Sequence, residues 1–207
     1  SLRDVAIDMP AGPSEVEVIA DESANPAFIA ADFLSQAEHG VDSQAMLVTA
    51  SESIVEPVMQ AIREQLDRLP RKEITEKSLS HSRLIVLKDK QEVIDFTNLY
   101  APEHLIIQTT DYADIAGQVE NAGSVFMGPY TPESAGDYAS GTNHTLPTNG
   151  YAKAYSGVNL DSFIKKITFQ EITADGIRLL GGTIRTMAAN EQLDAHKNAV
   201  TIRLNTL

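Results

Sequence analysis

Apolar residues recur with two different periods along the first part of the chain, and each period predicts its own kind of element. The segment 15–20 (EVEVIA) alternates polar and apolar positions as a strand does. Apolar runs that predict further strands follow at 45–50, 82–87, 104–109 and 124–128. The segments between them have helical spacing, which predicts helices from Pro26 to a stop at Gly40, and over 51–69, 91–100 and 112–121. Strands that alternate with helices indicate a mainly parallel sheet covered on both faces.

The pattern breaks after Gly128. Residues 128–157 are rich in Gly, Ser, Thr, Asn and Pro and show no period, and so long a loop inside a compact domain is usually functional or disordered. Interleaved Tyr and Leu side chains argue against disorder. Helical segments are predicted beyond Asn159, at 161–167, 175–190 and 191 to about 200. The predicted class is therefore α/β: a partial Rossmann-like parallel sheet with helices on both faces over residues 1–158, followed by a small helical C-terminal appendage over 159–207.

Composition narrows the possible partners. The 207 residues include 16 Lys+Arg against 29 Asp+Glu, a net charge of −13. This balance argues against nucleic acid or an anionic membrane, because phosphate binding needs a basic face. No apolar run reaches membrane-spanning length, no signal peptide opens the chain, and the absence of cysteine excludes disulfides and thiolate sites. A cytoplasmic location fits. The start, SLRDVAIDMP, lacks an initiator Met, so we expect a fragment of a longer protein.

The hexamer SQAEHG (residues 35–40) combines amide, carboxylate and imidazole groups at the predicted end of a helix. Gln36 and His39 are three positions apart and share one helix face. They could therefore supply two ligands to one metal ion, with the remaining ligands coming from elsewhere. An ordinary polar helix end is the alternative.

Two other stretches carry acid and imidazole groups together. Glu103 and His104 stand at a predicted helix-to-strand junction, where the pair could perform general acid–base chemistry near neutral pH. A surface Glu beside a helix-capping His is the alternative. The long loop carries Glu133, Asp137 and His144 among small residues that let backbone approach a ligand. A tight turn capped by Asp137 would explain the same loop without function.

The C-terminal stretch EQLDAHKNAV places Glu191 and His196 on a predicted helix, where a solvated face is the default interpretation. Ser14 precedes a strand without any visible triad order. The chain has no G-x-G-x-x-G after a strand, and therefore no dinucleotide fingerprint of its own. It also lacks G-x-S-x-G, a P-loop and H-E-x-x-H.

Seven segments, spread over nearly the whole chain, closely resemble the histidinol dehydrogenase family in that family's order. They are MPAGPSEV, LSQAEHG, YAPEHL, GSVFMG, PESAGDYASGTNHTLPT, AYSGVNLDSF and LDAHKNAV. The longest of these is very specific. The resemblance covers only the C-terminal half of a typical member, and the half that includes the nicotinamide-binding domain is absent.

The resemblance assigns roles to particular residues. It implies zinc binding by Gln36, His39, Asp137 and His196, a nitrogen and oxygen set that manganese could also occupy. It makes Glu103 and His104 the catalytic acid–base pair. It also implies that the substrate site is lined by these ligands together with Ser14, His104 and Glu191, and it suggests a supporting role for His144.

The reaction that the resemblance implies is the oxidation of L-histidinol through histidinal to L-histidine, with two NAD⁺ used in succession. Zinc would orient the substrate, His104 would remove the alcohol proton, and Glu103 would activate water for the second step. The NAD site is expected mainly in the missing half. The family also implies a homodimer with crossed C-terminal segments.

Two questions stay open from the sequence. The chain could be a catalytically inactive fragment that only folds and dimerises; a metal hydrolase would fit the ligand types but not the loop signature. In addition, Gln36, His39 and Glu103 all precede predicted strands, whereas ligands of open α/β sheets usually bind at the carboxyl ends. Either the predicted boundaries are wrong, or the missing half completes a site at the opposite edge.

Overall fold

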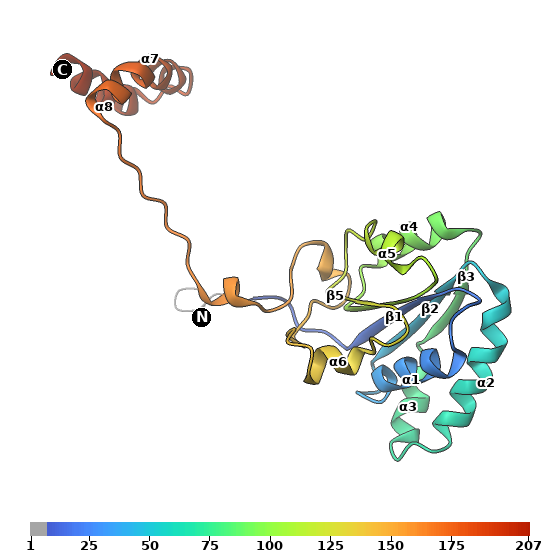
Figure 1. Cartoon of the computed structure of the whole chain (residues 1–207). Coiled ribbons are helices and arrows are strands. Elements are labelled where there is room, and N and C mark those ends of the chain that lie inside the picture. Colours follow the sequence, from blue (N-terminus) through green and yellow to red (C-terminus); the bar gives the residue numbers. More distant parts are fainter. Residues whose placement is uncertain (1–7) are drawn as a thin grey trace. The chain divides into compact units, whose positions relative to one another are not determined.

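The computed structural model describes residues 8–207, so the first seven residues of the expected first domain lie outside the described part (Figure 1). The chain divides into two compact units, the first ending at Ile164 and the second running from Lys165 to Leu207. The first unit contains the sheet and the second contains only helices.

The first unit alternates strands and helices as predicted, with some additional short helices. Its elements in order are β1 (Glu15–Ala20), α1 (Pro26–Ala37), β2 (Gln44–Thr49), η1 (Glu52–Ile54), α2 (Val55–Leu66), α3 (Lys72–Leu79), β3 (Arg83–Val86), α4 (Lys90–Tyr100), β4 (His104–Gln108), α5 (Tyr112–Ala116), β5 (Ser124–Met127), α6 (Glu133–Tyr138), η2 (Tyr151–Lys153) and η3 (Leu160–Phe163).

The five strands form one sheet in the order β3-β2-β1-β4-β5, and every pairing is parallel. The central strand β1 pairs with β2 on one side and β4 on the other, with Val16 opposite Ala45 and His104. Strands β2 and β3 are added on one side of β1 and strands β4 and β5 on the other, so the strand order reverses between β1 and β4. This confirms the predicted class, a partial Rossmann-like parallel sheet followed by C-terminal helices.

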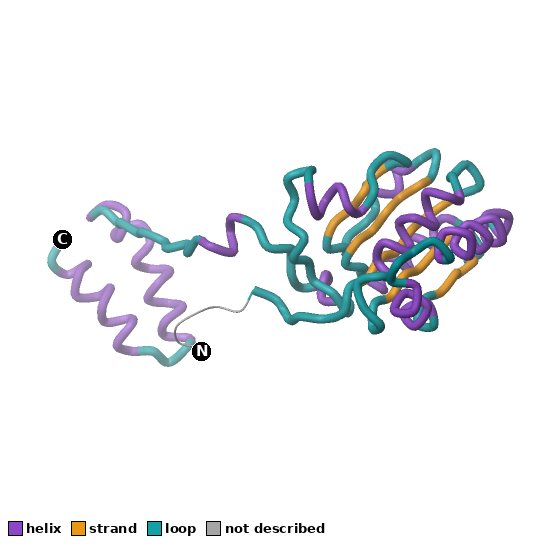
Figure 2. The backbone as a smooth tube through the Cα atoms, turned by 90° about the horizontal axis from the view of Figure 1, so that it is seen from below, coloured by secondary structure: helices purple, strands orange, loops and turns teal. Residues whose placement is uncertain are grey.

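Helices flank the sheet (Figure 2), and its three inner strands β2, β1 and β4 are buried on both faces, each face by its own core. On one face, α1 and α2 pack Phe33 and Val58 against β-strand residues such as Val18. On the other, α4 packs Val93 against residues such as Ile107. Because parallel strands of this kind have no solvent face, all six residues of β1 are buried, including both of its glutamates.

Several predicted helices differ from the observed ones. The helix expected over 51–69 begins with the 3₁₀ turn η1 and ends at Leu66, and α5 stops at Ala116 rather than near 121. The helix expected over 161–167 is wrong, since only the 3₁₀ turn η3 forms there, ending at Phe163. Helices α3 and α6 were not predicted, because α3 has a mostly polar sequence and α6 lies inside the loop.

The second unit is a pair of helices, α7 (Ala174–Asn190) and α8 (Asp194–Asn205), that pack against each other. Gly181 lets the two helices approach closely, because a Cβ there would come within 2.8 Å of the Leu204 side chain. Few side chains are buried in this pair, and many large apolar ones are exposed. Within residues 8–207, no helix is long and apolar enough to cross a membrane.

Candidate active site

Five of the residues expected to carry chemistry gather at the amino edge of the sheet. Glu15 begins β1 and His104 begins β4, and the two strands are neighbours. The chain reaches this edge from α1, whose start is fixed by the Asn25 side chain accepting a hydrogen bond from the Ala27 N–H, with Pro26 in the first turn. Gln36 and His39 precede β2 and Glu103 precedes β4, as the predicted element boundaries required. The cluster therefore lies at the edge opposite the one where ligands usually bind.

The carboxyl edge contains a separate cavity of about 290 Å³ at the point where the strand order reverses. It is lined by the ends of β1 and β4 and by side chains such as Asp21, Lys90 and Thr109. None of the residues expected in the site lines it. The usual ligand crevice of this fold and the candidate site are thus at opposite ends of the strands.

A tight turn delivers Glu103 and His104 to the site. Helix α4 ends at Tyr100 and is followed by the cap residue Ala101, whose φ of 58° lies in the left-handed region that a residue with a Cβ seldom adopts. The buried Ala101 holds this conformation while its N–H donates to the Thr97 carbonyl at 2.7 Å. Gly123 crosses close by, and a Cβ there would lie 2.5 Å from the Glu103 carbonyl oxygen. The junction is therefore fixed by packing on both sides.

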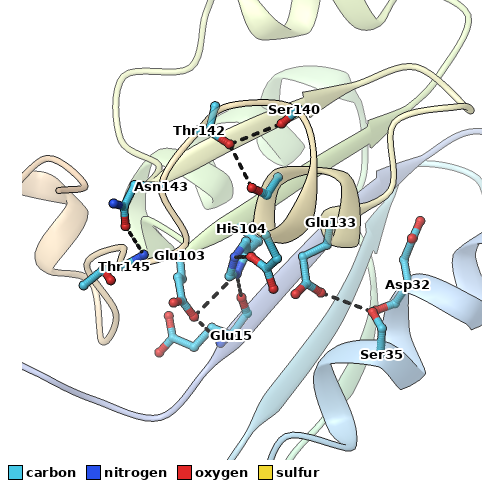
Figure 3. A network of polar contacts seen from close by, with 12 residues as sticks. Glu15, Asp32, Ser35, Glu103, His104, Glu133, Ser140, Thr142, Asn143 and Thr145 are labelled. Atoms are coloured by element: carbon cyan, nitrogen blue, oxygen red, sulfur yellow. Dashed lines mark hydrogen bonds and ion pairs between the residues drawn. The ribbon is translucent and has the colours of Figure 1, made fainter. Parts of the chain in front are cut away.

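The ring of His104 is buried and oriented by its Nδ1 atom (Figure 3). Nδ1 lies 3.0 Å from the backbone carbonyl oxygen of Glu15, and 3.5 Å from Oε2 of Glu103. A carbonyl oxygen can only accept, so Nδ1 is the protonated nitrogen and Nε2 has the free lone pair. Nε2 is buried without a hydrogen-bond partner, 4.0 Å from Oδ1 of Asp137. Nε2 of His104 is therefore the ring atom that can accept a proton.

The surrounding carboxylates set the proton affinity of this ring. Burial lowers the pKa of His104, but the hydrogen bond and charge of Glu103, with the charge of Glu133, outweigh it and raise the pKa above its usual value. Glu103 is itself held, because its Oε2 accepts from the Glu15 backbone N–H at 2.8 Å. Burial, with the nearby charge of Glu103, raises the pKa of Glu15 despite a hydrogen bond from the Asn149 N–H. The carboxyl groups of Glu15, Glu103 and Glu133 are thus all buried close to the His104 ring.

Gln36 lies fully buried on the last turn of α1, beside Glu133 at the start of α6. With its amide oriented as its neighbours require, Nε2 donates to both carboxylate oxygens of Glu133, at 2.7 and 2.9 Å. Oε1 accepts from the Glu15 N–H at 3.0 Å. The Ser35 hydroxyl also donates to Glu133, at 3.2 Å. Burial raises the pKa of Glu133, and Asp137 adds to the effect.

Glu133, Asp137 and His39 form the only group in residues 8–207 in which three acid or imidazole ligand atoms lie within 4.8 Å of one another. Glu133 and Asp137 are one turn apart on α6 and share its face. Gly136 lets α6 approach the sheet, because a Cβ there would lie 2.7 Å from the Phe126 ring. Nitrogen and carboxylate oxygen are suitable ligands for zinc, so this group fits a divalent ion.

The other expected residues are placed differently. Half-buried Ser14 and exposed His39 line one cavity of about 710 Å³. His144 is exposed in the loop, and no contact ties it to the cluster among the described residues. Glu191 and His196 are exposed in the second unit, at the end of α7 and on α8. The structure thus brings Gln36, His39, Glu103, His104 and Asp137 together within the first unit.

Sequence reasoning missed the part that Glu15 plays and left Glu133 without a role. In EVEVIA, Glu15 looks like the polar face of a half-exposed strand, yet its backbone orients both Glu103 and His104. Asp32, which is buried on α1, was also missed; burial and then the charge of Glu133 raise its pKa to about 7. Acidic positions on elements that are packed from both sides are the signal that could have found these residues.

Fold and site together define a parallel α/β protein that carries a buried carboxylate–imidazole pair beside a group of potential metal ligands. The chain belongs to the histidinol dehydrogenase family, whose model matches residues 2–204.

Individual relatives agree with this assignment. The chain is 70% identical over 207 residues to a histidinol dehydrogenase of Bacteroides thetaiotaomicron, covering 100% of this chain and 48% of that protein. It is 59% identical over 204 residues to the chloroplastic histidinol dehydrogenase of Arabidopsis thaliana, covering 98% and 44%. The crystal structure of histidinol dehydrogenase from Elizabethkingia anophelis superposes with a TM-score of 0.95 at 58% identity, covering 98% and 47%. The chain spans about half the length of the relatives it matches.

Proposed function

We propose that this chain supplies the substrate-binding and acid–base half of a histidinol dehydrogenase, which oxidises L-histidinol through histidinal to L-histidine with zinc and NAD. Membership of the family supports both the reaction and a role in histidine biosynthesis. The observation that carries the proposal is the His104 ring, with Nδ1 held by a carbonyl and Nε2 buried and unpartnered. The cytoplasmic location stays a prediction.

His104 accepts the proton of the substrate hydroxyl at Nε2 while hydride leaves the carbon. Its orientation does not depend on substrate, because the Glu15 carbonyl fixes the ring in advance. Glu103 acts in the second step, where it takes a proton from the water that attacks the aldehyde. The two groups lie 3.5 Å apart, so the charge of Glu103 acts directly on the His104 ring.

Gln36, His39, Asp137 and His196 would hold the zinc ion. The convergence of His39 and Asp137 supports the first part of this set, and Gln36 lies beside them through its contact with Glu133. When bound, zinc would orient the imidazole and amine of the substrate. Ser14 and Glu191 would line the same substrate site.

The hydride acceptor would bind outside this chain, which has no dinucleotide fingerprint. We therefore expect the isolated chain to be inactive and to act as a module for folding and dimerisation. A fused enzyme tests this, made of the chain joined to the N-terminal half of the Bacteroides thetaiotaomicron relative. With L-histidinol, zinc and NAD⁺, the fused enzyme should form NADH and the chain alone should not. If both proteins form NADH, the proposed location of the NAD site is wrong. If neither does, the proposal of a dehydrogenase half fails and the chain is only a module for folding and dimerisation.

A further inference from the structure

Gln36 differs from the other expected ligands because only one end of its side-chain amide can bind a metal ion. Only the oxygen of an amide can bind a cation, whereas its NH₂ group repels one. At Gln36 one end of the amide lies against the two oxygens of Glu133, at 2.7 and 2.9 Å, and the other lies 3.0 Å from the Glu15 N–H. The first environment accepts hydrogen bonds and the second donates one, so the NH₂ group faces Glu133. The oxygen then has a second lone pair that this N–H does not use.

Of the two neighbours, Glu133 is the one that depends on this arrangement. The Glu15 N–H already donates to Glu103 at 2.8 Å, so it is satisfied whichever way the amide turns. Glu133 is only 2% exposed, and within residues 8–207 its side chain has one other hydrogen bond, the longer contact from Ser35. If the amide turned over, two carboxylate oxygens would face the amide oxygen in a buried region, which is costly.

We propose that Glu133 is a positioning residue: it holds the NH₂ end of the Gln36 amide and so keeps the oxygen end available to the metal ion. This inference rests on the zinc site proposed above. Residues that orient metal ligands typically change metal affinity by about 10- to 100-fold when they are replaced. Glu133 belongs to α6, inside the loop of residues 128–157, and Gln36 belongs to α1, so the contact also joins the two segments that supply ligands.

The substitution Glu133→Gln tests this with little change of volume. A glutamine at this position offers both an acceptor and a donor, so it no longer discriminates between the two ends of Gln36. We expect zinc affinity of the full 207-residue chain, measured by competition with a chromogenic chelator, to fall by about 10- to 100-fold. Ser35→Ala is the matched control, because it removes the weaker contact to the same carboxylate and should change affinity by less.

A double-mutant cycle separates positioning from direct ligation, since Glu133 also belongs to the group of close ligand atoms. In a Gln36→Ala background there is no amide to orient, so Glu133→Gln should change zinc affinity by no more than about 2-fold. A general loss of folding would lower affinity in both backgrounds, and circular dichroism of the metal-free variants monitors it. An undiminished loss of affinity in the Gln36→Ala background would overturn the proposal and make Glu133 a ligand itself.

A third substitution distinguishes this inference from the proposed function. His39→Ala should weaken zinc binding strongly whether or not Glu133 orients Gln36. If His39→Ala leaves affinity unchanged, or the unchanged chain binds no zinc, the proposed metal site fails and the inference fails with it. If His39→Ala weakens binding while the cycle is additive, only the role of Glu133 is wrong.

Discussion

The orientation and protonation of the His104 ring depend on backbone groups as much as on side chains. The carbonyl of Glu15 determines which ring nitrogen carries the proton, and the N–H of the same residue holds Glu103. One backbone unit at the start of β1 therefore orients both members of the acid–base pair. Because main-chain groups do not change with residue type, this part of the site leaves no signature in the sequence.

The acid–base pair should divide its work between the two half-reactions. In the fused enzyme, His104→Gln removes the base at Nε2 and should slow alcohol oxidation by about 10²- to 10⁴-fold, the usual range for a general base. Glu103→Gln should slow aldehyde oxidation more, since water must be activated there. Single-turnover assays started from histidinol or from histidinal measure the two steps separately. Equal slowing of both steps by both substitutions would contradict this division.

At the same scale, the sequence indicated candidate residues for the chemistry but not the contacts between them. The adjacent Glu103 and His104 would point to opposite faces of a regular strand, and the strained Ala101 turn brings them together instead. The pairing of Gln36 with Glu133 joins residues far apart in the sequence, so no spacing rule could reveal it. Such contacts follow from packing α6 against the sheet, which only the structure supplies.

Among the elements, β1 carries an unusual acid that no expected chemistry uses. Glu17 is fully buried in the middle of the strand and accepts a hydrogen bond from the Thr97 hydroxyl on α4. Burial raises its pKa to about 8, although the hydrogen bond from Thr97 lowers it somewhat. The neutral acid is therefore the form that suits the folded protein.

This acid should make stability depend on pH. The folded pKa is raised above the ordinary value of 4.5, so the stabilising contribution is complete below about pH 4.5 and is lost as pH rises towards 8. The Glu17→Gln side chain resembles the neutral acid and should flatten this dependence. Urea unfolding at several pH values between 5 and 8.5 measures it, with the exposed Glu120→Gln as control. A slope that Glu17→Gln leaves unchanged would assign the pH dependence to other groups.

Helix α6 should be sensitive to one added methyl group. At Gly136 a Cβ would lie 2.7 and 2.8 Å from the Phe126 ring, so Gly136→Ala must push the helix away from the sheet. We expect a loss of about 1–3 kcal/mol in the free energy of unfolding, together with weaker zinc binding, because Asp137 moves with α6. Gly117→Ala is the matched control, since its Cβ would make only ordinary contacts at 3.5 Å. Unchanged zinc affinity in Gly136→Ala would separate the packing of α6 from the site.

The elements that could be predicted were those with a clear apolar period. All five strands and the helices α1, α2, α4 and α5 follow from alternation, apolar runs and helical spacing, because burying those faces is what builds the sheet. Helix α6 (ESAGDY) has too few apolar positions to show a period, and it forms against Phe126 and the ligand cluster. The turn η3 fails to extend into the expected helix over 161–167, although DSFIKKI has helical spacing.

On the scale of the whole molecule, the second unit has little core of its own. Its two helices bury only Gly181, Ala188 and Val200. Large apolar side chains are exposed on the same pair: Leu179, Leu180, Met187, Leu193 and Ile202. So much exposed apolar surface on so small a unit indicates that it docks on another surface, and we propose that this surface belongs to a second copy of the chain.

A crossed dimer would place His196 and Glu191 in the active site of the partner copy, and complementation tests this directly. Fused enzymes that carry His39→Ala or His196→Ala should each be inactive as homodimers, because every site lacks one ligand. After unfolding, mixing in equal amounts and refolding, half of the dimers pair the two variants. Each such heterodimer has one site with both histidines and one with neither. The mixture should therefore regain about a quarter of the unsubstituted activity.

The matched control for this experiment mixes His39→Ala with Asp137→Ala. Both substitutions lie in the first unit, so every site in every dimer lacks a ligand and refolding should restore nothing. Recovery in the first mixture and none in the second would place His196 across the dimer, since only exchange between chains can rebuild a complete ligand set. If neither mixture recovers while the unsubstituted enzyme refolds to full activity, His196 acts within its own chain and the crossed arrangement is wrong.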